Sequence, residues 1–170
     1  MIIKQKVADL MNAQIASEFA ASAQYVAIAV HFDDLALPEL AGFFYSQAEE
    51  ERMHAMKFVH FMLEVGTKPI IPGIPALKNE FEGLVEPVQF ALDQEMKVTD
   101  EINNLVSAAV SVNDHTSNQF LQWFVTEQVE EIDTMTTLLQ TIKHAGSNVL
   151  WVEDFIRRNP QHAGPGEAAA

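Results

Sequence analysis

The sequence predicts an all-α protein, a four-helix bundle with a long crossover between its second and third helices and a short fifth helix. Four long segments repeat apolar residues at intervals of three and four, which is the spacing of one buried helix face. Between the second and third segments, residues 67–79 hold three prolines and a glycine, so no regular element is expected there. At 170 residues, the chain is long enough for one domain with a full core.

The first two helices are expected to form an antiparallel hairpin. Helix one is predicted from Lys4 to about Phe32, and residues 33–37 make a short connection. Pro38 suits the first turn of helix two, which runs to about Val65, where Gly66 stops it. Two long helices joined by so short a link lie side by side in opposite directions.

The crossover allows helix three to start at the end of the bundle where helix one began. Helix three is predicted from about Glu82 to Val112, with Pro87 tolerated near its start, and helix four from about His115 to Ala145. The crossover is rich in apolar residues, so we expect it to pack down on the bundle.

A fifth helix is predicted from Val149 to Arg158, after a possible cap at Ser147 or Asn148, and Pro160 ends it. Since the four-helix core leaves no free face for its apolar side, we expect that side to be buried against other subunits. Residues 159–170, which are rich in glycine, proline and alanine, are expected to be a disordered tail, and residues 1–158 the folded domain.

Acids interrupt the apolar stripe of every long helix. In helix two, steps of three and four from Phe44 land on Gln47, Glu51, His54 and Phe58, which places an acid and a histidine one turn apart on the buried face. The other stripes carry, in chain order, Glu18, Glu95, Glu127 and Glu131, with Gln128 beside the last two.

Such a set of buried acids requires a counter-charge. One unpaired buried carboxylate costs several kcal/mol, and four or five together would exceed the roughly 5–15 kcal/mol net stability of a domain. Lys57 is the only basic residue within reach on these faces. Several glutamates with one histidine make a hard, oxygen-rich metal site, so we interpret the pattern as metal-binding.

The composition excludes other classes. A net charge of −14 favours cations as partners and argues against nucleic acid and anionic membranes. The absence of cysteine excludes disulfides, thiolate metal sites and cysteine nucleophiles. Neither a signal peptide nor a membrane-spanning segment is evident, so a cytoplasmic, soluble protein is expected.

The acids recur in a two-fold pattern. Glu18 precedes the pair Glu51 and His54 by 33 residues, and Glu95 precedes a second pair that begins at Glu127 by 32. Two such hairpins, face to face, would enclose a pocket for two metals, as in carboxylate-bridged di-iron bundles.

Four stretches carry a resemblance to a known family: Glu18 followed by Tyr25 seven residues on, and residues 46–55, 91–95 and 122–131. Together they resemble the bacterial non-haem ferritins, and the likeness spans nearly the whole chain. The resemblance implies a ferritin-like di-iron domain over residues 1–158. It also implies iron storage by a shell of twenty-four copies, which oxidises Fe(II) with O2 or H2O2 at a di-iron ferroxidase centre in each subunit and keeps Fe(III) inside as a mineral.

The resemblance also implies roles by position. The first iron position would use Glu18, Glu51 and His54, and the second would use Glu51, Glu95 and Glu131, with Glu51 bridging. Tyr25 and Gln128 would form hydrogen bonds beside the two irons. A third, transit position would use Glu50, Glu127 and Glu130.

Two departures from related families affect what is expected. Bacterioferritins have the haem-ligating methionine where this chain has Arg52, and a second histidine where it has Glu130, so no haem is expected. Animal ferritins line a threefold channel with acids where this chain has Asn118 and Leu121. The iron uptake route therefore stays open, with Asp114 and His115 as candidates.

Two other functions are compatible with these residues. A di-iron oxidase or oxygenase that acts on a small organic substrate would use the same ligands. A metal-free structural bundle would keep the acids protonated, and Glu50, Glu127 and Glu130 would then be ordinary polar residues that flank the stripe.

Overall fold

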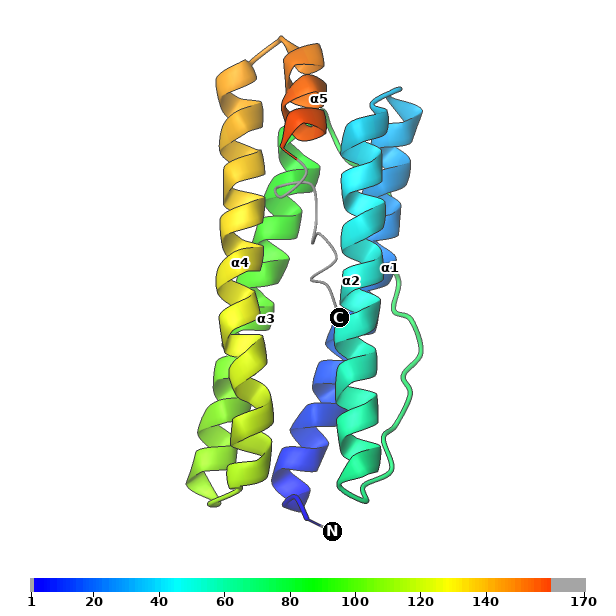
Figure 1. Ribbon diagram of the computed structural model, residues 1–170. Coiled ribbons are helices and arrows are strands. Elements are labelled where there is room, and N and C mark those ends of the chain that lie inside the picture. Colours follow the sequence, from blue (N-terminus) through cyan, green and yellow to red (C-terminus); the bar gives the residue numbers. More distant parts are fainter. Residues whose placement is uncertain (1, 160–170) are drawn as a thin grey trace.

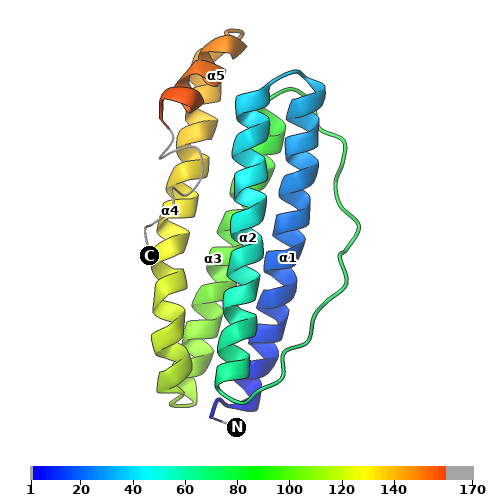
Figure 2. The ribbon, with the colours of Figure 1, turned by 45° about the vertical axis from the view of Figure 1, so that its right-hand side comes forward.

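The computed structural model describes residues 2–159, which form five α-helices and no strand (Figure 1). The helices are α1 (Gln5–Asp34), α2 (Pro38–Glu64), α3 (Val85–Ser111), α4 (His115–Ala145) and α5 (Val149–Arg158). The first four lie side by side as a bundle, and α5 folds back over one end of it (Figures 1 and 2). The predicted all-α architecture is confirmed. No helix in the described part of the chain is long and apolar enough to cross a membrane.

The predicted boundaries differ from the structure by a few residues. Helix α3 begins at Val85 rather than Glu82, because residues 83–84 form a turn in which Gly83 has a φ of +59°. Pro87 lies in the first turn of α3, where its missing N–H costs no helical hydrogen bond. Of the predicted tail, residues 160–170 lie outside the described residues.

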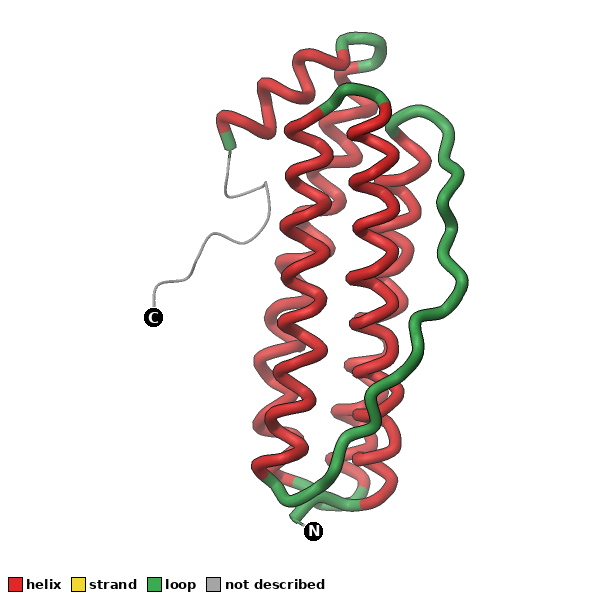
Figure 3. The backbone as a smooth tube through the Cα atoms, turned by 90° about the vertical axis from the view of Figure 1, so that its right-hand side faces the viewer, coloured by secondary structure: helices red, strands yellow, loops and turns green. Residues whose placement is uncertain are grey.

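The crossover runs the length of the bundle along α1 (Figures 2 and 3). The amide of Ile70 donates to Asn12 Oδ1 (2.8 Å). Further along, the buried Gln24 side chain makes two hydrogen bonds to the backbone of Lys78, donating to its carbonyl oxygen at 2.7 Å and accepting from its N–H at 3.0 Å. The crossover is thus attached to α1 by polar contacts.

The expectation that the apolar side chains of the crossover pack down is wrong for its isoleucines. Ile70, Ile71 and Ile74 are 66, 61 and 68% exposed. The hydrogen bonds from α1 hold the backbone of the crossover, and these side chains remain on its outer side.

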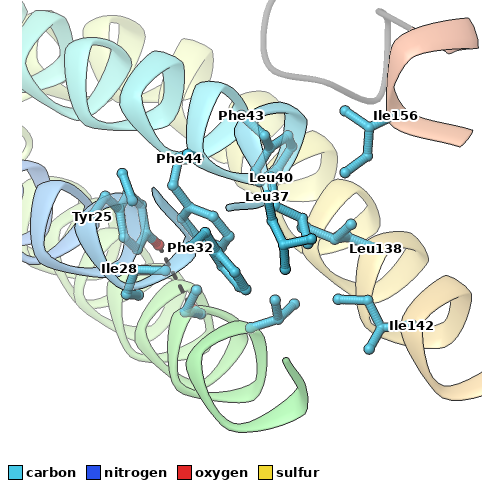
Figure 4. Packing of buried hydrophobic residues seen from close by; sticks show 14 of the residues in the cluster. Tyr25, Ile28, Phe32, Leu37, Leu40, Phe43, Phe44, Leu138, Ile142 and Ile156 are labelled. Carbon is cyan, nitrogen blue, oxygen red and sulfur yellow. Dashed lines mark hydrogen bonds between the residues drawn. The ribbon is translucent and has the colours of Figure 1, made fainter. Parts of the chain in front are cut away.

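The core consists of two apolar clusters with a polar layer between them. One cluster, at the end where α5 lies, includes Tyr25, Phe32 and Phe44 (Figure 4). The other, at the opposite end, includes Met11, Phe58 and Phe124. Along every long helix, the positions between the two clusters are those that carry the buried acids.

Helix α5 buries its apolar side on its own chain. Val152 and Ile156 are buried and pack into the nearer cluster, so the predicted burial of this side against other subunits is wrong for them. The open end of the bundle supplies the surface that the four-helix pattern did not predict. Leu150 and Trp151 remain 78 and 46% exposed.

A carboxylate of α5 also caps α2. Glu153 accepts hydrogen bonds from the backbone N–H groups of Glu39 and Leu40, both at 3.0 Å. The side chain of Leu37, the residue before α2, cannot accept hydrogen bonds from these N–H groups. The start of α2 therefore depends on α5 for its hydrogen bonds and for a favourable charge.

We expect Glu153→Ala to lower the free energy of unfolding by about 1 kcal/mol, the usual cost of losing a helix cap. Chemical denaturation measures this loss, and faster hydrogen exchange at Glu39 and Leu40 would place it at the start of α2. Asp154→Ala is the matched control, because among residues 2–159 Asp154 pairs only with Arg157 and Arg158, on α5 itself. Equal losses in the two variants would contradict the capping role.

Candidate metal centre

The four long helices bring their acids to one layer of the core. The buried glutamates there are exposed by 4% or less. They are Glu18 on α1, Glu50 and Glu51 on α2, Glu95 on α3 and Glu131 on α4. His54, which is 3% exposed, lies among them on α2, and Glu127 on α4 is half-buried at the edge of the layer.

These residues form three overlapping groups, each with ligand atoms within 4.8 Å of one another. One group is Glu18, Glu51 and His54; the second is Glu51, Glu95 and Glu131; the third is Glu50, His54, Glu127 and Glu131. The first two share Glu51. A carboxylate shared in this way can place one oxygen on each of two neighbouring cations.

Tyr25 and Gln128 both contact Glu95. The Tyr25 hydroxyl donates a hydrogen bond to Glu95 Oε1. Gln128 Nε2 donates to Glu95 Oε2 at 3.2 Å and also lies 3.1 Å from the hydroxyl oxygen of Thr99. These contacts from α1 and α4 fix the orientation of a carboxylate that α3 supplies.

His54 lies between two of the groups. Its Nδ1 is 3.5 Å from Glu51 Oε2, and its Nε2 is 3.8 Å from Glu127 Oε1 and 4.0 Å from Glu50 Oε1. The edge of the layer is aromatic, since the Trp123 ring centre lies 5.5 Å from that of His54. Lys57, the only basic residue that the sequence placed within reach, is exposed and lies 4.1 Å above the Trp123 ring, so its charge acts on Glu127 at the edge of the layer and does not neutralise the buried acids.

Burial and mutual repulsion oppose ionisation of the acids. Burial raises the pKa of Glu51 well above its ordinary value, and the charges of Glu95 and Glu18 raise it further. The pKa of Glu131 is likewise raised well above the ordinary range, first by burial and then by Glu95 and Glu51.

Two acids have intermediate values. Burial raises the pKa of Glu95 to about 7, although the hydrogen bonds from Tyr25 and Gln128 act in the opposite direction. Burial also raises the pKa of Glu50 to about 7, and the nearby charge of His54 opposes the shift. Near neutral pH, the layer therefore retains protons that a cation can displace.

The histidine and the edge acid act as a charge pair. Burial by itself lowers the pKa of His54, but Glu127 and the charges of Glu18, Glu131 and Glu50 outweigh it and raise the value to about 9. The contact with His54 in turn lowers the pKa of Glu127, against the effect of burial. For Tyr25, burial and then the charge of Glu95 raise the pKa well above 10.

The layer suits a cation. Glu18 Oε2 and Glu51 Oε1 are buried, and neither has a hydrogen-bond partner among the described residues. A buried acceptor without a donor is costly unless something electropositive is bound to it. Carboxylate oxygens with one imidazole are the donors that Fe(II), Mn(II) and Zn(II) accept, so the residues present fit a pair of such ions.

Some candidate residues lie elsewhere. Glu130 is exposed and belongs to none of the three groups, because it lies one residue from Glu131 and so on another side of α4. Asp114 is buried as the cap of α4, accepting from the N–H of Ser117 at 3.0 Å and of Lys4 at 3.1 Å, which gives it a structural role. His115 is exposed.

Two polar residues of the layer were not predicted as parts of the site. Gln14 and Gln47 are almost fully buried and donate to Glu18 and Glu50, respectively. The sequence carried a signal for both, since each interrupts an apolar stripe one turn before an acid.

The chain is similar to known proteins in both sequence and structure. The family model described as "Ferritin-like domain" matches residues 8–145. Ferritin BfrB of Mycolicibacterium smegmatis is 48% identical over 155 residues, which cover 91% of this chain and 86% of that protein. A bacterial non-heme ferritin of Staphylococcus saprophyticus is 33% identical over 153 residues, covering 89% and 92%. An open pore ferritin from Archaeoglobus fulgidus superposes with a TM-score of 0.89 at 27% identity, covering 91% and 96%.

We expect the metal-free protein to lose stability as the pH rises from about 4.5, the ordinary pKa of a glutamate, to about 9, the pKa of His54. Glu50 and Glu95 have folded-state pKa values of about 7 against an ordinary 4.5. Their contribution is complete below about pH 4.5 and is lost as the pH passes through about 7. The pKa of His54 is raised from 6.5 to about 9, so its contribution to stability is also lost as the pH rises, but over a higher range.

Thermal unfolding of the chelator-treated protein across this pH range measures the effect. A Glu50→Gln, Glu95→Gln double variant should show a weaker pH dependence, and a saturating divalent cation should stabilise the wild-type protein most at the high-pH end. A metal-free protein whose unfolding temperature stays constant or rises over this range would contradict the assignment.

Proposed function

The chain belongs to the ferritin-like domain family, and on that premise we propose that it stores iron. In this proposal, each subunit oxidises Fe(II) to Fe(III) with O2 or H2O2 at a di-iron centre, and the product collects as a mineral inside a shell of identical subunits. Iron is thus the substrate and the cargo.

One observation carries the proposal: two groups of buried ligands share Glu51. Glu18 and His54 complete the first, and Glu95 and Glu131 complete the second. Adjacent metal ions can deliver one electron each to the same oxidant, which a single ion cannot do. With O2 as the oxidant, two Fe(II) ions each lose one electron, and O2 gains these two electrons and two protons to become H2O2.

The protein side chains supply binding, orientation and charge. Carboxylates stabilise Fe(III) more strongly than Fe(II), because hard, anionic oxygens interact best with the higher charge. Tyr25 and Gln128 hold Glu95 by hydrogen bonds, so that this ligand is oriented before iron arrives. The elevated pKa values of Glu50 and Glu95 imply that binding of Fe(II) releases protons.

The third group supports a transit position next to the di-iron pair. Glu50, His54, Glu127 and Glu131 form it, and Glu127 is its most exposed member. A position at the edge of the layer would allow iron to leave towards the mineral without crossing the apolar clusters. Glu130, one turn from Glu127 on the exposed side, would bind iron on its way out.

Exposed apolar side chains support assembly with further copies. Leu150 and Trp151 on α5, and Ile70, Ile71 and Ile74 on the crossover, remain outside the core of one chain. We take these side chains as the apolar part of surfaces that contact other subunits. We propose that these contacts build the twenty-four-subunit shell. The absence of haem and the cytoplasmic location stay predictions.

We expect Glu51→Gln to lower the rate of Fe(II) oxidation by at least roughly tenfold, because it removes a negative charge that both positions share. His54→Ala should also lower the rate of Fe(II) oxidation, because it removes a ligand of the first position. Absorbance at the wavelength of ferric oxo species, followed after Fe(II) is mixed with air-saturated buffer, measures the rate. Glu49→Gln is the control, because Glu49 is exposed and pairs with Arg52 at 3.2 Å.

Unchanged oxidation in Glu51→Gln, with the shell intact by size-exclusion chromatography, would reject the site. Oxygen uptake that required an organic substrate, with no iron retained, would favour a di-iron oxidase or oxygenase instead. Two hollows on the surface, beside α3 and the crossover, are lined by none of the acids in the three groups.

A further inference from the structure

Two buried glutamines lie one turn before the acids that they contact. Gln14 is 2% exposed, and its Nε2 donates to Glu18 Oε1 at 2.9 Å on α1. Gln47 is 1% exposed, and its Nε2 donates to Glu50 Oε2 at 2.8 Å on α2. Each amide thus occupies one oxygen of a carboxylate and leaves the other to face the layer.

At Glu18, the division between the two oxygens is complete. Oε1 accepts the hydrogen bond from Gln14, whereas Oε2 is buried and has no partner among the described residues. Glu51, which two ligand groups share, differs: its Oε1 has no hydrogen-bond partner among the described residues, and its Oε2 lies 3.5 Å from His54 Nδ1. In the described part of the chain, neither oxygen of Glu51, the acid suited to bridging, accepts a hydrogen bond from an amide, whereas Oε1 of Glu18 does.

The Gln14 amide has little freedom to move away from Glu18. Its neighbours on the buried face of α1, Met11 and Ile15, are fully buried, and no apolar atom could accept its N–H groups. If Glu18 turned to place both oxygens on one cation, the hydrogen bond from the amide would be bent or lost at a position that is only 2% exposed to solvent. The hydrogen bond therefore opposes two-oxygen binding.

We propose that Gln14 is a positioning residue that confines Glu18 to one-oxygen coordination of the first metal position. This inference rests on the proposed function. With one oxygen from Glu18, one from Glu51 and one nitrogen from His54, the first position has three protein ligand atoms. It therefore keeps open coordination sites at which the oxidant can bind and from which a substrate ion can leave.

Replacing Gln14 by methionine tests the proposal, because methionine has a similar volume and no N–H group. In Gln14→Met, Glu18 is free to bind with both oxygens, and the coordination number of the first ion rises. Co2+ can report the coordination number, because six-coordinate Co2+ absorbs visible light more weakly than Co2+ with fewer ligands. It would be bound without oxygen at two ions per subunit. We expect weaker absorption with both ions still bound, and Fe(II) oxidation slowed roughly 10- to 100-fold.

Gln24→Met is the matched control. Gln24 lies on the same helix, is buried, and makes hydrogen bonds to the Lys78 backbone rather than to an acid of the layer. Its loss should lower stability and leave the Co2+ spectrum unchanged. An unchanged spectrum and rate in Gln14→Met, or equal changes in both variants, would overturn the proposal.

A measurement on the wild-type protein keeps the proposal testable if Gln14→Met does not fold. In a crystal structure with Zn2+ bound, one oxygen of Glu18 should lie on the metal and the other within hydrogen-bond distance of Gln14 Nε2. Both oxygens on the metal would overturn the role of Gln14 and leave the proposed function standing. Failure of the wild-type protein to bind Co2+, Zn2+ or Fe(II) would instead overturn the proposed function itself.

Discussion

Electrostatic repulsion within one buried layer is the constraint on which the rest of the structure depends. Five glutamates from four helices meet between two apolar clusters, with one histidine and no buried lysine or arginine among the described residues. Ionised together without a counter-charge, they would cost more than the roughly 5–15 kcal/mol by which a domain is stable. The metal-free chain reduces this cost by holding protons, and the pair of cations that we propose would remove it by neutralising the carboxylates.

The remaining features of the bundle position this layer. Met11 and Phe58 on one side, and Phe32 and Phe44 on the other, keep water out and hold the helices in register. The polar contacts made at the layer then orient single oxygens. Further away, Glu153 of α5 caps the start of the helix that carries Glu51 and His54, so the end of the bundle and the site share one structural element.

Much of this arrangement could be predicted from the helical periodicity of the sequence, because an acid at a buried position is conspicuous in an apolar stripe. Glu18, Glu51, Glu95 and Glu131 were identified in this way. On α4, however, the stripe passes through Gln128, and Glu127 lies half-buried at the edge. Steps of three and four residues along α4 reach both Glu127 and Gln128. Which of the two is buried depends on the packing of α4 against its neighbours. The Gln14 and Gln47 amides contact acids one turn away on their own helices, so periodicity placed them beside those acids without giving the direction of the amide. The exposed isoleucines of the crossover and the docking of α5 depend on contacts between distant segments, which periodicity does not encode.

The most direct test of the shared layer is anomalous diffraction at the iron absorption edge, from crystals soaked in ferrous salt without oxygen. Two iron peaks are expected in each subunit, both in contact with Glu51, one beside Glu18 and His54 and the other beside Glu95 and Glu131. Carboxylates that point to separate places with no iron between them, or iron found only on the outer surface, would contradict the account.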